Sequence, residues 1–444
     1  MKNYFQEISY ETFQNIVTSS ANPSLLCGNG LSINFEPQLT LNSLGENLYK
    51  THTHIVKFSD YKVVSPKMKP VLLPNYKATI KYLEQVIHNA EEFLDFFSDA
   101  VNFAKGITNP QVIEWITDNK FNTKLVMGFG PLDYVTDLIK QAESSDSAFK
   151  VNYEYWTILI YFALVLAQAP SNIYISPEAN KFVKAVAIGA EQSLGIGSNN
   201  QPDYFSKTCE NGMFTYLRLL LATNILLVGN GYHVEQMSKW DFFQRDVLKQ
   251  FFALFNYVLT TNYDLLVEKI TDGAVSHLHG CYTRQPQIVL GQSLGVFIDA
   301  VRYDLSSILI GDYFVAKSFY ATTVHMAQKS SSNTKINFHQ EVLKQIIEKE
   351  KSDTIVIFGL NINNDYHIVR DLQVFLYQSG MPQANIIFCY FSKEDRTAFR
   401  EAYESCITYS EELNKYVQEH ISTYTIDSHS ILQRFFIERD KRIY

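Results

Sequence analysis

An almost wholly apolar stretch, residues 354–358 (TIVIF), constrains the fold of this chain more than any other feature. Strands with one face in water alternate apolar and polar side chains, whereas an unbroken apolar run is typical of a strand covered on both faces. Residues 385–391 have the same character, and residues 421–426 read as a further strand. Helical patterns lie between these strands, and this alternation predicts a doubly wound, mostly parallel sheet with helices on both sides.

Polar side chains follow two other short strands, at residues 258–261 and 275–278. The first strand runs into Asn262 and Asp264 before a helical pattern, and the second ends at His279. The carboxyl ends of parallel strands meet at the edge of the sheet where open α/β folds bind ligands. An amide and an imidazole at this edge can orient a water and hold a sugar hydroxyl. Asn262 and His279 are therefore our first-choice catalytic pair, with Asp264 in support.

Each of these residues also has a structural interpretation. Asn262 or Asp264 would serve equally well as the cap of the helix that follows them. His279 could be a buried histidine of the core whose polar atoms are satisfied by the protein. His277 lies two residues before His279, on the same face of an ideal strand, and competes with it for the catalytic role.

A glycine turn, Gly-Asn-Gly at residues 28–30, follows an earlier apolar strand at residues 23–27. Glycine lets the backbone come close to a ligand, and the next helix presents N–H groups, so the turn can cradle a phosphate or a ribose. The structural alternative is a tight strand–helix turn with no ligand. A second Gly-Asn-Gly turn at residues 229–231 follows the apolar run at 225–228 and echoes the first turn, so either turn can serve as the ligand cradle. Ser32 follows the first turn and favours it as the ligand cradle.

Between the first glycine turn and the later strands the chain reads as mostly helical. Apolar residues recur at spacings of three and four over residues 76–103, while residues 40–75 read as an irregular excursion or short hairpin. We therefore predict three segments. Residues 1–40 hold the first strand and glycine turn of an α/β domain, 41–221 form an inserted helical domain, and 222–444 complete the α/β domain and end in a helix.

The composition excludes several classes of protein. Aromatic residues make up 14% of the 444 residues, which argues against disorder. The net charge of −8 provides no global basic field for nucleic acid, and no P-loop sequence is present. None of the five cysteines forms a CxxC pair, so we expect no metal site and reduced thiols in the cytoplasm. The most apolar run, residues 155–167, is too short to cross a bilayer and predicts a core helix.

Four short motifs occur in an order that resembles the sirtuin-like (silent information regulator 2-like) domain of bacterial proteins. They are GNGLS after the first strand, TTNYD, LHG and IVIFGLNINNDYHI. In the sirtuin family the corresponding elements are a GAG-x-S turn, a T-x-N-x-D turn, an HG pair and a G-x-S/N turn, which line an NAD pocket on a Rossmann-like sheet. The resemblance covers about residues 20–35 and 255–395, and it implies a Rossmann-like fold for the α/β domain.

The resemblance implies a role for each residue that matches a motif. Asn262 matches the catalytic asparagine that places a water or ribose group, His279 the catalytic histidine, and Asp264 the neighbouring aspartate. The residues implied to bind NAD are Gly28, Asn29, Gly30 and Ser32 beside the phosphates and ribose, Thr261 in the second motif, Gly359 and Asn361 on the adenosine side, and the polar pair Asp365 and His367.

The chain departs from deacylating sirtuins after the HG pair, where those enzymes carry a zinc module with four cysteines. Here the segment between Gly280 and Cys389 contains only one cysteine, Cys281, so no such module can be built. The resemblance therefore implies the NAD-cleaving branch found in bacterial anti-phage defence, which releases nicotinamide and ADP-ribose and causes abortive infection. Such a hydrolase is expected to stay inactive until a partner protein, a ligand or oligomerisation triggers it. The alternatives are a non-catalytic sensor of NAD or ADP-ribose and an interaction subunit of a defence complex.

Overall fold

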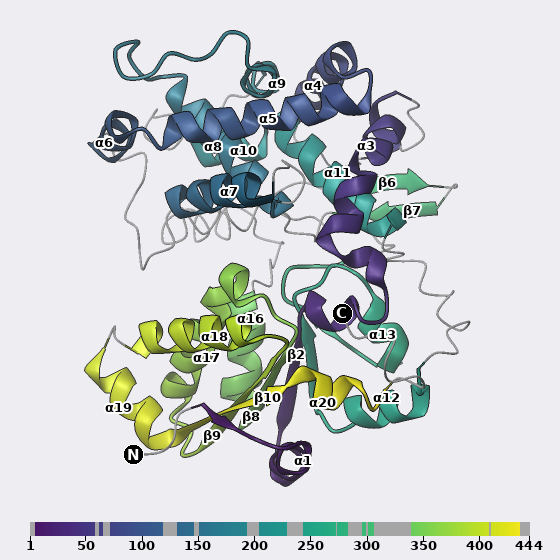
Figure 1. Cartoon of the computed structure of the whole chain (residues 1–444), viewed down its shortest axis with the longest axis vertical. Helices are drawn as coiled ribbons and strands as arrows, with labels where there is room; N and C mark the ends of the chain where they lie inside the picture. Colours follow the sequence, from purple (N-terminus) through teal and green to yellow (C-terminus); the bar gives the residue numbers. More distant parts are fainter. Residues whose placement is uncertain are drawn as a thin grey trace. The chain divides into compact units, whose positions relative to one another are not determined.

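The chain forms two compact units in the computed structural model, which describes residues 5–57, 62–64, 72–118, 131–145, 151–192, 204–228, 243–271, 273–282, 295–298, 301–305, 339–407 and 410–435. We call the first the sheet unit; it comprises Met1–Leu39, Gly229–Cys281 and Asn337–Tyr444. The second, the helical unit, comprises Thr40–Val228 and Tyr282–Ile336. Figure 1 labels the elements of both units.

This division differs from the predicted segments in the second half of the chain. The prediction returned all of residues 222–444 to the α/β domain, but 222–228 and 282–336 belong to the helical unit. Strand pairing provides a physical reason for the second stretch. Strand β6 (Gly295–Ile298) pairs antiparallel with β3 (Lys62–Val64) and with β7 (Val301–Asp304). Because β3 follows the first helix of the helical unit, this pairing places β6 and β7 in the same unit.

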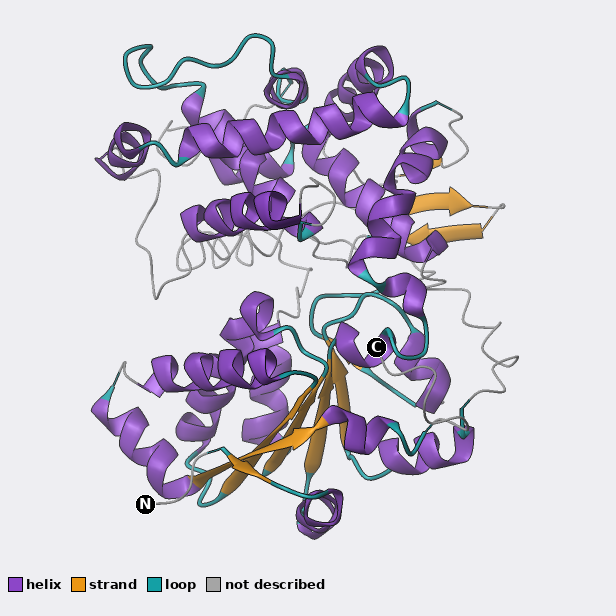
Figure 2. Ribbon diagram, viewed as in Figure 1, coloured by secondary structure: helices purple, strands orange, loops and turns teal. Residues whose placement is uncertain are grey.

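The sheet unit is built on a parallel sheet, drawn in orange in Figure 2. Its seven described strands lie in the order β1-β10-β9-β8-β2-β4-β5, and every described pair is parallel. The order reverses beside β2, because β4 and β5 follow on one side while β8, β9 and β10 follow on the other. The strands are β1 (Gln6–Glu7), β2 (Pro23–Cys27), β4 (Tyr257–Thr260), β5 (Ser276–His277), β8 (Thr354–Phe358), β9 (Ala384–Tyr390) and β10 (Ile421–Asp427).

Helices cover both faces of this sheet, which confirms the predicted α/β fold with a parallel sheet. Strands β2 and β8 are buried along their whole length, as their apolar sequences predicted. One face packs against α1 (Tyr10–Ser19), α12 (Arg245–Phe252), α13 (Leu266–Thr271) and α20 (Ser428–Leu432). The other packs against α16 (His339–Lys344), a π-helical turn at Gln345–Lys349, α17 (Ile362–Ser379), α18 (Lys393–Ile407) and α19 (Glu411–His420).

The core of the helical unit contains two helices that are apolar on nearly every side, as buried helices are. These are α8 (Trp156–Leu166) and α11 (Gly212–Val228), and the first confirms the core helix predicted from the run at 155–167. Within the described part of the chain, no helix combines the length and apolar character needed to cross a membrane. The remaining helices of this unit are α3 (Leu41–Val56), α4 (Leu72–Val86), α5 (Ala90–Ile107), α6 (Pro110–Asp118), α7 (Pro131–Ser145), α9 (Lys181–Ile188) and α10 (Tyr204–Cys209).

The prediction of an irregular excursion or short hairpin over residues 40–75 is wrong for residues 41–56 and 72–75, which belong to α3 and to the start of α4. Polar residues of α3 face the core instead of water. The side chain of His52 is buried against the Tyr216 hydroxyl at 2.7 Å, and Thr51 donates a hydrogen bond to Asn224 at 2.9 Å. Both partners lie on α11. A polar helix face that finds its partners inside the protein does not show the apolar periodicity on which the prediction depended.

The structure also differs from the sequence patterns at residues 76–103 and 225–228. The periodic pattern over 76–103 is divided between α4 and α5, and Asn89 caps the second of them by accepting a hydrogen bond from the Glu92 N–H at 2.9 Å. The apolar run at 225–228, which echoes the first strand in sequence, forms the last turn of α11. The second Gly-Asn-Gly turn, at 229–231, lies outside the described residues.

Candidate functional site

Two glycine turns touch each other at the carboxyl edge of the sheet. The turn after β2 begins at Gly28 and leads into α2 (Asn29–Ser32), and the turn after β8 begins at Gly359. The Gly28 N–H donates to the carbonyl of Phe358 at 2.8 Å, and the Gly30 N–H donates to the carbonyl of Gly359 at 2.8 Å. The first and last of the four motifs are therefore in direct backbone contact.

These glycines are required by the packing of the two turns. A Cβ atom on Gly28 would lie 2.3 Å from the carbonyl oxygen of Gly359, and one on Gly359 would lie 2.3 Å from the backbone nitrogen of Leu31. Gly359 also has a φ of +71°, which other residues rarely adopt. The structural interpretation of the first turn is thus sufficient to explain its glycines, and any ligand role comes in addition.

Asn262 joins the second motif to the first. It follows the end of β4, and its Nδ2 donates a hydrogen bond to the Ser32 hydroxyl at 2.8 Å. Both residues are buried, with exposed fractions of 8% and 1%. The backbone N–H of Asn262 donates to the Thr260 hydroxyl at 3.1 Å, so the backbone of this residue is held in place as well.

The backbone of the neighbouring strands sets the position of this turn. The Thr261 N–H donates to the carbonyl of Cys27 at 3.0 Å, and the Leu278 N–H donates to the carbonyl of Thr260 at 2.8 Å. Thr261 is therefore tied to β2 and is buried, while the LHG motif begins beside the end of β4. Because β4 lies between β2 and β5, the turns that follow these three strands meet at one edge.

His277, the competitor of His279, holds the asparagine turn in place. Its Nδ1 bonds to the carbonyl oxygen of Asn262 at 2.8 Å, and its Nε2 bonds to the carboxylate of Glu268. Burial lowers the pKa of His277, but the Glu268 carboxylate and the Asn262 carbonyl outweigh burial and raise that pKa above its ordinary value. Two acceptors around one ring favour the imidazolium, which donates to both. This arrangement makes His277 a positioning residue.

Asp264 caps the helix that follows the turn. Its Oδ1 accepts a hydrogen bond from the Leu266 N–H at 3.0 Å, at the start of α13, and the residue is only 5% exposed. Burial raises its pKa to about 6, while the Leu266 N–H and the positive charge of His277 partly oppose this rise. The predicted cap is therefore present for Asp264, and its acidic proton titrates close to neutral pH.

We expect Asp264→Asn to stabilise the protein at alkaline pH, because the asparagine keeps the cap and removes a buried charge. A pKa raised from 3.8 to about 6 favours folding below pH 3.8 and loses that contribution as the pH rises through 6. The variant should therefore gain about 3 kcal/mol in free energy of unfolding at pH 8 and little near pH 4. Urea unfolding of both proteins at the two pH values measures this difference.

Asp427→Asn is the matched control for this change. Asp427 also caps a helix, accepting the His429 N–H at 3.0 Å, but its side chain is 47% exposed. Its variant is expected to change stability little at either pH, because an exposed carboxylate stays hydrated. An Asp264→Asn protein that is less stable than the parent at pH 8 would contradict the argument from burial.

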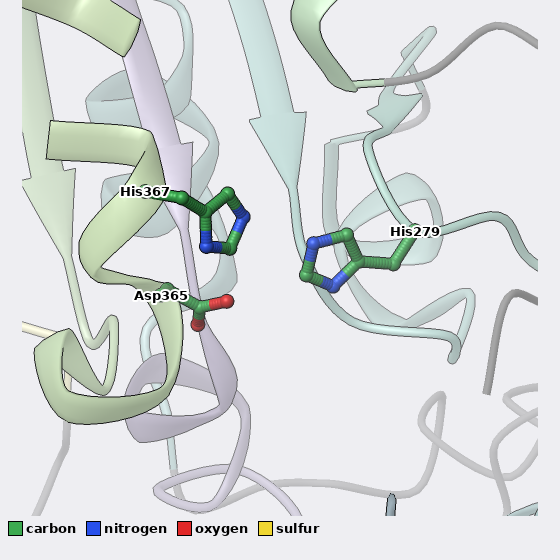
Figure 3. Close-up of side chains that lie close together, drawn as sticks. All are labelled: His279, Asp365 and His367. Atoms are coloured by element: carbon green, nitrogen blue, oxygen red, sulfur yellow. The ribbon is translucent and has the colours of Figure 1, made fainter. Parts of the chain in front are cut away.

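His279 lies beside the polar pair that follows the last motif. Figure 3 shows His367 and Asp365 extending from α17 toward His279, which follows β5. The two imidazole rings are stacked, with centroids 6.1 Å apart and an interplanar angle of 26°. One polar atom from each of the three side chains lies within 4.8 Å of the other two. Both histidines are buried and Asp365 is partly exposed, so the structure brings together residues of the third and fourth motifs.

A break in α17 explains how Asp365 and His367 reach the same place. Residues two apart on a regular helix do not face the same side. Asp365 has φ −111° and ψ 23°, values outside the helical range, so the helix is interrupted at this residue. The interruption directs both side chains toward His279 (Figure 3).

The two remaining predicted residues bond to the backbone near them. The Asn29 side chain donates to the carbonyl of Leu39 at 3.2 Å, and the Asn361 side chain caps α17 by accepting the Asn363 N–H at 3.2 Å. Both residues are exposed. Their side chains are held at the ends of turns, where they stabilise the local backbone.

Glu268, whose carboxylate holds His277, was not among the predicted site residues. Its only signal was an acidic residue in the first turn of the helix after the TTNYD motif, a position that acidic residues commonly occupy for electrostatic reasons. The bond to His277 depends on the parallel pairing of β4 with β5, which periodicity alone does not reveal.

None of the family models, curated proteins or solved structures with which the chain was compared matches it. The function proposed below is supported by the order of the four motifs and by the geometry of the site.

Proposed function

We propose that this protein is an NAD+ hydrolase that releases nicotinamide and ADP-ribose. The observation that carries the proposal is the bond between the Asn262 amide and the Ser32 hydroxyl, which unites the glycine turn with the asparagine turn. It lies at the carboxyl edge where the strand order reverses, the place where open α/β sheets bind ligands. The order β5-β4-β2-β8-β9-β10 also corresponds to the 3-2-1-4-5-6 order of Rossmann-like dinucleotide-binding sheets, which supports this choice of substrate.

The reaction breaks the bond between C1′ of the ribose and the nicotinamide nitrogen. The bonding pair leaves with nicotinamide, which is already a fair leaving group as a pyridinium, and an oxocarbenium-like state forms. A water then attacks C1′ and gives up a proton. Asn262 orients this water or the 2′-hydroxyl, and His279 accepts the proton. His277 and Glu268 hold the asparagine turn in the geometry that this step needs.

The glycine turns provide the surface on which the dinucleotide lies in this proposal. Gly28, Gly30 and Gly359 bring the two turns into backbone contact, and the pyrophosphate of the substrate would lie against this paired backbone. Ser32 and Thr261 supply hydroxyls near the ribose, and Asp365 and His367 supply polar atoms near His279. Asn29 and Asn361 lie at the outer ends of the turns, where they can contact the remaining phosphate and adenosine groups.

The proposed biological role is that of an effector of anti-phage abortive infection, acting in the cytoplasm. A hydrolase that were always active would deplete its own host of NAD. We therefore include in the proposal that a partner protein, a ligand or self-assembly releases the activity.

The decisive experiment is NAD turnover by the purified chain at high protein concentration, followed as nicotinamide release. Calorimetry with NAD is run in parallel. Turnover supports the hydrolase. Binding without turnover favours a latent enzyme or the second candidate, a non-catalytic sensor of NAD or ADP-ribose. The absence of both turnover and binding contradicts the proposal and favours an interaction subunit.

A further inference from the structure

The geometry points to a binding site for one divalent transition-metal ion of the zinc class at His279, Asp365 and His367. We call these residues the His–Asp–His cluster. The sequence predicted no metal site, since none of its cysteines forms a CxxC pair. The cluster instead combines two imidazoles and a carboxylate from two separate elements, a loop after β5 and the interrupted start of α17 (Figure 3).

The distances in the cluster suit an ion after a small adjustment. One candidate ligand atom from each side chain lies within 4.8 Å of the others. A tetrahedral Zn²⁺ with bonds of about 2.1 Å holds its ligand atoms about 3.4 Å apart. Side-chain rotations that close the cluster by up to about 1.4 Å would therefore complete three of the four ligand positions. The fourth position is then available to a water or to a group of a bound ligand.

The donor atoms decide which ions fit. Imidazole nitrogen suits Zn²⁺, Co²⁺ and Ni²⁺, whereas Mg²⁺ and Ca²⁺ are bound by oxygen ligands. Two of the three donors are imidazoles, so the site selects against the two abundant oxygen-seeking ions. Both histidines are buried and their rings are stacked, so two imidazoles, the commonest metal ligands in proteins, are brought together at one place.

A bound ion has a consequence that rests on the proposed function. His279 uses the same lone pair to hold a metal ion and to accept a proton. An occupied cluster therefore cannot supply the base for NAD cleavage, and the ion acts as an inhibitor. Removal of the ion would be one way in which a trigger releases the activity.

The test uses the full chain after treatment with a chelator, and its first probe is Co²⁺ alone, followed by visible absorption. Zn²⁺ alone is then titrated by calorimetry. We expect one ion per chain, and at least a tenfold weaker affinity in both His367→Ala and Asp365→Asn. Asp365→Asn is nearly isosteric and partly exposed, so it separates a lost ligand from a lost fold, and thermal unfolding of each variant checks this.

His429→Ala is the matched control, because His429 lies 2.8 Å from the carboxylate of Asp427 in a His–Asp pair outside the cluster. It is expected to leave metal affinity unchanged. The proposal is overturned by a chain that binds no stoichiometric ion, or by two cluster variants that bind as tightly as the parent.

Because metal binding is measured without NAD, its result can be interpreted even if the proposed hydrolase activity is not found. Where NAD is cleaved, added Zn²⁺ should slow the parent enzyme, and a parent enzyme that cleaves NAD equally fast with the ion bound overturns the inhibitory role.

Discussion

Replacing His279 with alanine is expected to reduce the rate of NAD cleavage by about 10²–10⁴-fold, the usual contribution of a general base. Asn262→Ala should reduce it by about 100-fold, because the attacking water loses its orientation. Both losses should appear mainly in kcat, since neither residue holds the bulk of the dinucleotide. Nicotinamide release under saturating NAD measures them, in whatever state of the protein shows turnover.

Ser32→Ala tests the contact on which the proposal depends. The serine hydroxyl accepts the Asn262 amide at 2.8 Å, so its loss should free the asparagine side chain and give a smaller decrease in kcat than Asn262→Ala. Asn256→Ala is the control, because Asn256 is an exposed asparagine of the same unit whose side chain bonds to the carbonyl of Ala21 and to the side chain of Asn22. Full NAD cleavage by both the Asn262→Ala and the His279→Ala proteins would show that the assignment is wrong.

Gly359→Ala is expected to destabilise the sheet unit by roughly 2–5 kcal/mol. The added methyl group would lie 2.3 Å from the backbone nitrogen of Leu31, and the φ of +71° is unfavourable for alanine. The neighbour is backbone of the turn after β2, so it cannot move aside without breaking the contact between the two glycine turns. Urea unfolding of the purified variant measures the loss.

Gly380→Ala separates the two causes of this destabilisation. Gly380 also has a positive φ, +61°, but an added Cβ atom would meet nothing within 4 Å. Its variant should therefore lose only about 1 kcal/mol, which is the backbone contribution alone. Equal losses in the two variants would mean that the contact between the turns contributes nothing measurable to stability.

The strands of the sheet unit could be predicted because burial on both faces leaves a local mark in the sequence. Residues 354–358 are apolar without interruption, and they form β8 at the centre of the sheet. The helical unit was harder to predict where polar side chains find partners inside the protein. In α3 the hydroxyl of Thr51 and the ring of His52 are satisfied by α11, so the helix reads as an irregular polar segment.

The candidate site shows the same limit. The sequence by itself determined which residues follow each strand, and parallel pairing then requires that the turns after β2, β4 and β5 meet at one edge. Only the tertiary structure decided that Asn262 bonds to Ser32, that His277 belongs to Glu268, and that a break in α17 turns Asp365 toward His279. These outcomes depend on side-chain directions and on the register between distant strands, and neither quantity is encoded by spacing along the chain.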